Sequence, residues 1–185
     1  MENVNLVRRL AKLQILCIRY IERNTSLRCK TFKDIDRIIT NDKLTCTYKE
    51  IIENLYNNIK KYCNNCEYLL EESLKLKEEI NNNSIKNLRF GVETQKKFTK
   101  EEKELNNEIL KEKFFMTNCM VGIKDVVKIL DNKVTATAIK QACWQERLLN
   151  TKKVGKTWLV HIPECRAYWN IPNTNEEYSY KDYIY

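Results

Sequence analysis

Glycine, proline and histidine are scarce in this chain of 185 residues, which holds three, two and one of them. Sheets with many turns need more glycine and proline, so the composition predicts a mainly helical fold. Three glycines also leave no glycine-rich loop to wrap a nucleotide phosphate. No apolar run approaches the roughly 18 residues of a membrane span. Arg8, Arg9 and Lys12 interrupt the first apolar stretch, unlike a signal peptide. We therefore expect a cytoplasmic protein without a membrane partner.

Side chains that could carry catalysis or hold a metal ion are sparse. Cys63 and Cys66 form the single Cys-x-x-Cys pair, and zinc would need two more ligands, for which Cys29 and Cys46 are the only nearby thiols. The surrounding pattern predicts a helix interior, where cysteine serves as a small apolar side chain. His161, the one histidine, falls on a predicted strand with no partners for a triad. We expect no catalytic residue, metal ion or cofactor, and reduced thiols as in a cytosol.

The positive charge favours an anionic partner, nucleic acid first. The net charge is +8, with a sequence pI near 9.0. Residues 116–169 hold nine Lys/Arg against four Asp/Glu, residues 1–115 hold 23 against 18, and residues 170–185 hold one against three. Positive charge per residue is therefore densest in the segment 116–169.

That segment begins with a pattern typical of two short helices. Apolar residues from Ile123 to Leu130 recur three and four apart, which predicts one face of a helix. Residues 131–133 predict a turn, since Asp and Asn bond their own backbone and tolerate left-handed conformations. Thr135 is placed to cap a second helix ending at Trp144. This helix should bury Ala138, Ile139, Ala142 and Cys143, and leave Thr137, Lys140, Gln141 and Trp144 facing outward.

A basic hairpin and a closing helix should follow. Residues 151–154 and 157–162 alternate with the period of strands around Gly155 and Lys156, and a glycine first in a two-residue loop suits a type II′ turn. Trp158 alternates toward the core. Pro163 suits the first turn of a helix because its missing N–H would have no partner there.

This order of elements, with the Val-Gly-Lys-x-Trp-Leu wing at residues 154–159, resembles the excisionase-like winged helix-turn-helix domains, relatives of the MerR-type DNA-binding head. The resemblance covers about 50 of the 185 residues, from about 120 to 169. It implies a bacterial, phage or mobile-element protein that regulates transcription or assists recombination. Two positions depart from the family: Glu146, where glycine is usual, and the bulky Trp144.

The outward residues have the chemistry for reading DNA. Lysine bonds guanine and glutamine bonds adenine in the major groove, so Lys140 and Gln141 are expected to contact base edges. Threonine hydroxyls and basic side chains bond phosphates. Ordinary solubilising charge remains the alternative for the lysines. The other expected DNA contacts are Thr135, Thr137, Arg147, Lys152, Lys153 and Lys156.

The N-terminal part should be helical throughout. Residues 3–23 predict a helix whose charges lie mostly off its apolar stripe, which indicates packing on a core or, alternatively, a basic face for a membrane or partner. Residues 31–39 predict a short helix. A capping box at Thr47 and Glu50 opens a periodic segment through Ile80, roughly 50 Å if it is one helix, a length typical of a coiled-coil arm.

A second capping box, at Thr99 and Glu102, opens a helix through about Phe115. The simplest packing lays it along the first long helix as a long antiparallel helical hairpin. Its apolar side would carry Leu105, Ile109, Leu110 and Phe114.

The expected architecture is thus mainly α. Residues 1–115 would form a helical dimerisation or partner-binding region, 116–171 a winged helix-turn-helix DNA-binding domain, and 172–185 a tyrosine-rich tail. One such head makes few base contacts, so we expect a homodimer on double-stranded DNA. The alternative is a protein–protein adaptor, or a phage-encoded inhibitor, that uses the N-terminal helices while the winged domain does not bind DNA.

Overall fold

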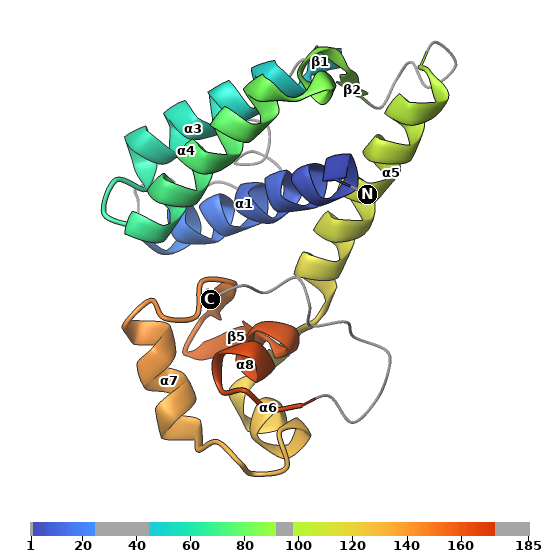
Figure 1. Cartoon of the computed structure of the whole chain (residues 1–185). Coiled ribbons are helices and arrows are strands. Elements are labelled where there is room, and N and C mark those ends of the chain that lie inside the picture. The colour runs from blue at the N-terminus through green and yellow to red at the C-terminus, as the bar shows by residue number, and fades with distance from the viewer. Residues whose placement is uncertain (1, 25–44, 92–97, 173–185) are drawn as a thin grey trace. The chain divides into compact units, whose positions relative to one another are not determined.

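The computed structural model describes residues 2–24, 45–91 and 98–172 (Figure 1). This part is mainly helical, as predicted, with seven α-helices and two small antiparallel sheets. The chain divides into two compact units, residues 1–115 (unit 1) and 116–185 (unit 2). Within the described ranges no helix is both long and apolar enough to cross a membrane. The expected helix at 31–39 and the tail beyond Pro172 lie outside the described residues.

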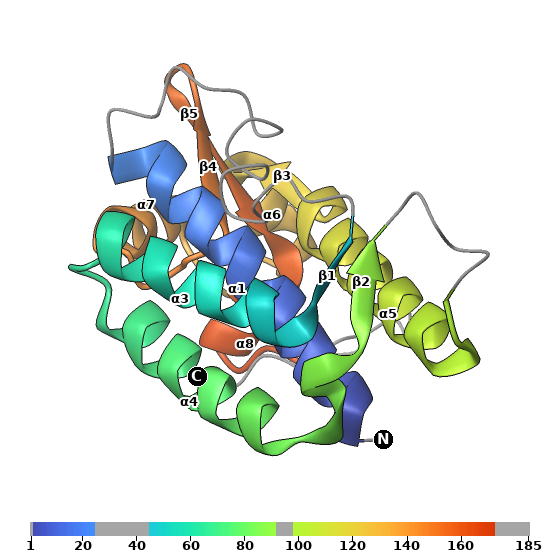
Figure 2. The same cartoon turned by 90° about the horizontal axis from the view of Figure 1, so that it is seen from above.

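Unit 1 is built on three helices that pack together, α1 (Glu2–Asn24), α3 (Tyr48–Tyr62) and α4 (Glu67–Asn82) (Figures 1 and 2). The strands β1 (Thr45–Thr47) and β2 (Arg89–Gly91) pair antiparallel beside them, and a 3₁₀ helix, η2 (Ser84–Asn87), precedes β2. The capping box at Thr47 and Glu50 is confirmed. The core of this unit includes Leu10, Ile52, Leu55, Ile59, Leu69, Leu76 and Ile80, all fully buried.

The prediction of one continuous helix from 47 to 80 is wrong. The chain reverses between α3 and α4, where Cys63 N–H donates to the Ile59 carbonyl (2.8 Å) and Cys66 N–H to the Cys63 carbonyl (2.9 Å). Asn64 and Asn65 are exposed at the reversal, and asparagine favours turns over helix interiors. The antiparallel helical hairpin is therefore α3–α4, and the pair of cysteines lies at its turn. Residues 47–80 therefore do not form the expected coiled-coil arm of roughly 50 Å.

The helix α5 (Lys100–Asn118) begins at the predicted capping box. The Glu102 carboxylate accepts the Thr99 N–H (2.8 Å), and the Thr99 hydroxyl accepts the Glu102 N–H (3.2 Å). Its predicted packing along the earlier helices is wrong, because the antiparallel partner of α3 is α4, and α5 lies to the side of that pair (Figures 1 and 2). The expected apolar side is consequently split. Leu105 and Ile109 are buried, whereas Leu110 and Phe114 are 48% and 69% exposed.

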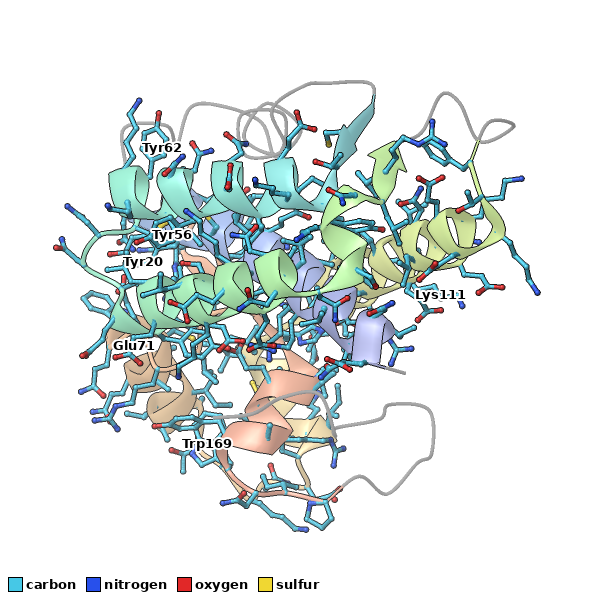
Figure 3. The ribbon with its side chains drawn as sticks, turned by 45° about the horizontal axis from the view of Figure 1, so that its top comes forward. Tyr20, Tyr56, Tyr62, Glu71, Lys111 and Trp169 are labelled. Atoms are coloured by element: carbon cyan, nitrogen blue, oxygen red, sulfur yellow. The ribbon has the colours of Figure 1, made fainter. Side chains whose placement is uncertain are left out.

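Ion pairs join the helices of unit 1. The Arg9 guanidinium of α1 bonds Glu72 (2.7 Å) and Glu79 (2.6 Å) of α4, and Arg8 bonds Glu108 of α5 (2.7 Å). Two basic side chains of α1 therefore form ion pairs with other helices of the unit. Across the hairpin, the Lys77 ammonium of α4 lies 4.8 Å from the ring centre of Tyr56 on α3 (Figure 3).

The described part of unit 2, through Pro172, forms a three-stranded antiparallel sheet, in the order β3-β5-β4, with three short helices. The elements in chain order are β3 (Met120–Gly122), α6 (Ile123–Ile129), α7 (Ala136–Trp144), β4 (Thr151–Val154), β5 (Thr157–His161) and α8 (Ile162–Tyr168). The second helix and the hairpin therefore form where the sequence predicts them, and Pro163 lies in the first turn of α8. Their shared core contains Ile123, Val126, Leu130, Val134, Ile139, Ala142, Cys143, Leu148, Val160, Cys165 and Ile171.

All three helices of unit 2 end in the left-handed conformation without a glycine. Asp131, Glu146 and Asn170 have φ values of 54°, 55° and 50°. In each case the following N–H bonds a carbonyl in the last turn of the helix, as when Arg147 N–H donates to the Ala142 carbonyl (2.9 Å). Glu146 therefore occupies a position of positive φ, a conformation that glycine adopts more readily than other residues.

Candidate nucleic-acid interface

The helix α7 presents a polar stripe on its outer side. Thr135 caps it by accepting the Ala138 N–H (3.2 Å), as predicted. Ile139, Ala142 and Cys143 are buried, and Ala138 is half-buried against the same core. Positions three and four apart share one side of a helix. The exposed side chains on the outer side are Thr137, Lys140, Gln141 and Trp144, the four predicted to face outward.

The β4–β5 hairpin turns at Gly155 and Lys156, between the paired residues Val154 and Thr157. Gly155 has φ +58°, the sign that the first central position of a type II′ turn requires. The Lys156 side chain is exposed at the tip. In the next residue pair behind the turn, Trp158 is half-buried against the core of unit 2, as its alternation predicts.

The two lysines of β4 point to opposite faces of the hairpin. Lys153 pairs with Trp158, and its ammonium lies 5.7 Å from the Trp158 ring centre and 5.9 Å from that of Trp144 on α7. Lys153 therefore lies on the face next to the end of α7. Neighbouring residues of a strand project to opposite faces, so Lys152 lies on the other face, where it is half-buried.

The connection from α7 to β4 is held by a buried carboxylate that sequence reasoning missed. Glu164, on α8, accepts the N–H groups of Leu149 (2.7 Å) and Asn150 (2.9 Å). The Asn150 amide in turn donates to the Met116 carbonyl (2.8 Å). In the sequence Glu164 only looks like a favourable acid in the first turn of a helix. Arg147, in the same connection, is exposed with its guanidinium 3.4 Å from the Tyr168 hydroxyl.

The positive excess of unit 2 lies at its surface. Among residues 116–172, one acid (Glu164) and one base (Arg166) are buried, with 1% and 6% of their surfaces exposed. The Arg166 guanidinium bonds the carbonyls of Ile129 and Pro172. Removing this buried acid and base from nine Lys/Arg and four Asp/Glu leaves a net excess of five positive charges on the exposed or half-buried side chains.

Six of the seven described cysteines, and the histidine, are buried as core residues. Among the described residues, no group of three or more His, Cys, Asp or Glu side chains is placed to hold a metal ion. The Sγ atoms of Cys17 and Cys63 lie 3.5 Å apart, and their hydrogen bond and burial raise the pKa of Cys17 well above its usual value. Burial likewise raises the pKa of Cys165. Such thiols stay protonated and unreactive at neutral pH. His161 is fully buried on β5.

No protein-family model, curated protein or solved structure matches this chain. The proposed function therefore rests on the geometry and charge of unit 2.

Proposed function

We propose that residues 116–171 form a winged helix-turn-helix and that the protein binds double-stranded DNA at specific sequences. It would act as a transcriptional regulator or a recombination accessory factor of a bacterium, phage or mobile element. The observation that carries this proposal is the exposed polar stripe of α7, Thr137, Lys140 and Gln141, beside a hairpin that carries exposed lysines.

The chemistry of the stripe suits the major groove. Lys140 donates to O6 and N7 of guanine, and Gln141 pairs with N6 and N7 of adenine. Thr137, near the start of α7, donates its hydroxyl to a phosphate. Thr135 already accepts a backbone N–H through its hydroxyl oxygen but keeps the O–H to donate. Lys153 and Lys156 supply charge along the DNA backbone, which makes the binding salt-dependent.

A homodimer completes the proposal. The outer face of one nine-residue helix reaches only a few base pairs, which gives little discrimination among genomic sites. Two heads on half-sites about one helical turn apart double the base contacts. Sedimentation of the full chain, free and on DNA, tests this point. A monomer in both states would contradict it.

Titration of the full chain against labelled duplex DNA tests the proposal itself. A random duplex of about 30 base pairs spans two half-sites one turn apart. At about 50 mM salt we expect dissociation constants below micromolar, rising steeply with added salt because counterions are released. Selection from a random pool should then yield a preferred sequence. Absence of binding below micromolar on random duplex at low salt would overturn the DNA-binding function.

The second candidate is a protein–protein adaptor or phage-encoded inhibitor in which unit 2 does not bind DNA. The observation in its favour is the exposed apolar pair Leu110 and Phe114, four residues apart on α5. Side chains at this spacing share one side of a helix and suit a partner helix. This candidate predicts a flat duplex titration, together with a self-association or partner affinity that Phe114→Ser weakens.

A further inference from the structure

Trp144 is the most exposed large apolar side chain among the described residues, with 73% of its surface accessible. It is the last residue of α7 and continues the stripe of Thr137, Lys140 and Gln141 by one turn. Lys140 lies one turn before it on the stripe and the Lys153 ammonium lies 5.9 Å from its ring centre, so the indole is an apolar group beside positive charges. The expected DNA contacts did not include it.

The indole contacts the hairpin through a lysine. The Lys153 ammonium lies between two rings, 5.9 Å from the centre of Trp144 and 5.7 Å from that of Trp158. Both distances are within the range at which a cation is attracted to an aromatic face. Trp158 packs against the core, so this bridge ties Trp144 to a fixed point. A side chain ordered in advance loses less entropy on binding a ligand.

We propose that Trp144 contacts the 5-methyl group of thymine in the major groove, and this assignment rests on the proposed DNA-binding function. Thymine is the only base that presents a methyl group there, and apolar side chains recognise it. One turn of helix is about 5.4 Å, so Trp144 reaches one or two base pairs beyond Lys140 and Gln141. Lys140 and Lys153 near Trp144 favour binding of a polyanion. DNA is a polyanion that carries the thymine methyl group.

Replacing thymine by uracil tests the contact directly. The probes are an alternating adenine–thymine duplex of about 30 base pairs and the same duplex with deoxyuridine for thymidine. The two duplexes share charge and minor-groove edges and differ in the methyl groups. Burying one methyl is worth about 0.8 kcal/mol, so we expect the full chain to bind the thymine duplex about fourfold tighter per contacted methyl.

The variants assign the effect to the residue. Trp144→Ala should keep salt-dependent binding, through the lysines, but bring the thymine-to-uracil affinity ratio close to one. Ile129→Ala is the matched control, because Ile129 is also an exposed apolar residue of unit 2 (37%) but lies on α6. It should keep the ratio of the unmodified protein. Unfolding curves of both variants verify that unit 2 stays folded.

The outcomes distinguish a failure of the DNA-binding function from a failure of the Trp144 contact. If the unmodified chain binds neither these duplexes nor random duplex at low salt, the DNA-binding function fails and this inference fails with it. If it binds random duplex but makes no distinction between thymine and uracil, the inference fails and the function stands. A ratio that survives Trp144→Ala removes Trp144 from the contact.

Discussion

The Glu164 carboxylate accepts hydrogen bonds from the backbone N–H of Asn150. Both carboxylate oxygens accept the Asn150 N–H, at 3.2 and 2.9 Å, and one also accepts the Leu149 N–H at 2.7 Å. Both residues are buried, with 1% and 0% of their surfaces exposed. The link ties α8 to the segment that leads from α7 into the hairpin, so it sets where the hairpin begins relative to α7.

Glu164→Ala should destabilise unit 2 by about 3 kcal/mol, because two buried N–H groups would lose a charged acceptor. All three tryptophans of the chain (Trp144, Trp158 and Trp169) lie in unit 2, so urea unfolding followed by tryptophan fluorescence reports on this unit. Glu164→Gln, which keeps one acceptor oxygen, should lose less. Equal losses in the two variants would contradict this account, because they would show that the acceptor oxygen and the volume kept by glutamine contribute nothing at this position.

Glu146→Gly should stabilise unit 2 by about 0.5–1 kcal/mol. The left-handed conformation costs a residue with a Cβ roughly 1–2 kcal/mol, and the greater freedom of glycine in the unfolded chain returns part of that gain. The neighbouring Gln145 has φ −84°, where glycine brings no relief, so Gln145→Gly should destabilise slightly. The same fluorescence unfolding measures both variants. A loss of stability in Glu146→Gly would contradict this account of the helix end.

Acid should weaken unit 1 through Glu102, whose pKa is lowered to about 2 from 4.5. The main cause is the hydrogen bond from the Arg89 guanidinium, helped by the N–H groups of Thr99 and Arg89. A carboxylate with a lowered folded-state pKa stabilises fully above the unfolded value, and this stabilisation is lost as pH falls from about 4.5 to about 2. Unfolding followed by far-ultraviolet circular dichroism should show a stability gap between the natural chain and Glu102→Gln that is largest above pH 4.5 and shrinks toward pH 2.

Glu104→Gln is the control for this pH experiment. Glu104 lies on the same helix, but its side chain is 64% exposed and its oxygen is 3.8 Å from the Lys100 ammonium. Exposed pairs of this kind contribute little to stability. The difference in unfolding free energy between Glu104→Gln and the natural chain should therefore be small at every pH. A gap as large as that of Glu102→Gln would count against the buried carboxylate as the source.

Lys140→Ala and Lys156→Ala should affect DNA binding in different ways. Lys140→Ala should cost about 1–3 kcal/mol on the preferred sequence and little on random duplex, because it removes a base contact. Lys156→Ala should weaken binding on all sequences alike and reduce the slope of log affinity against log salt by about one. Lys156 is the better choice for the second role because Lys153 also contacts two indoles. Identical effects of the two variants on both probes would remove the assigned roles.

Much of unit 2 could be predicted from the sequence because its signals are local. The Thr135 cap, the turn at Gly155 and the outward stripe of α7 depend on residues within a few positions of one another. The relation between Lys153 and Trp144 could not be predicted, because it requires knowing which hairpin face lies next to α7. Nor could the role of Glu164, whose partners are backbone N–H groups with no sequence signature.

The sequence by itself determined where most described helices begin, since caps at Thr47 and Thr99 bond residues three positions away. Only the tertiary structure decided that the periodic segment from 47 to 80 folds back at Asn64 and Asn65. Cys63 and Cys66 stay in phase with the apolar positions on either side and are buried, so a straight helix and a tight reversal have the same spacing of apolar residues. The periodicity of apolar residues shows which side of a helix is buried. Contacts between residues far apart in sequence decide which elements pack on that side and in which direction the chain then runs.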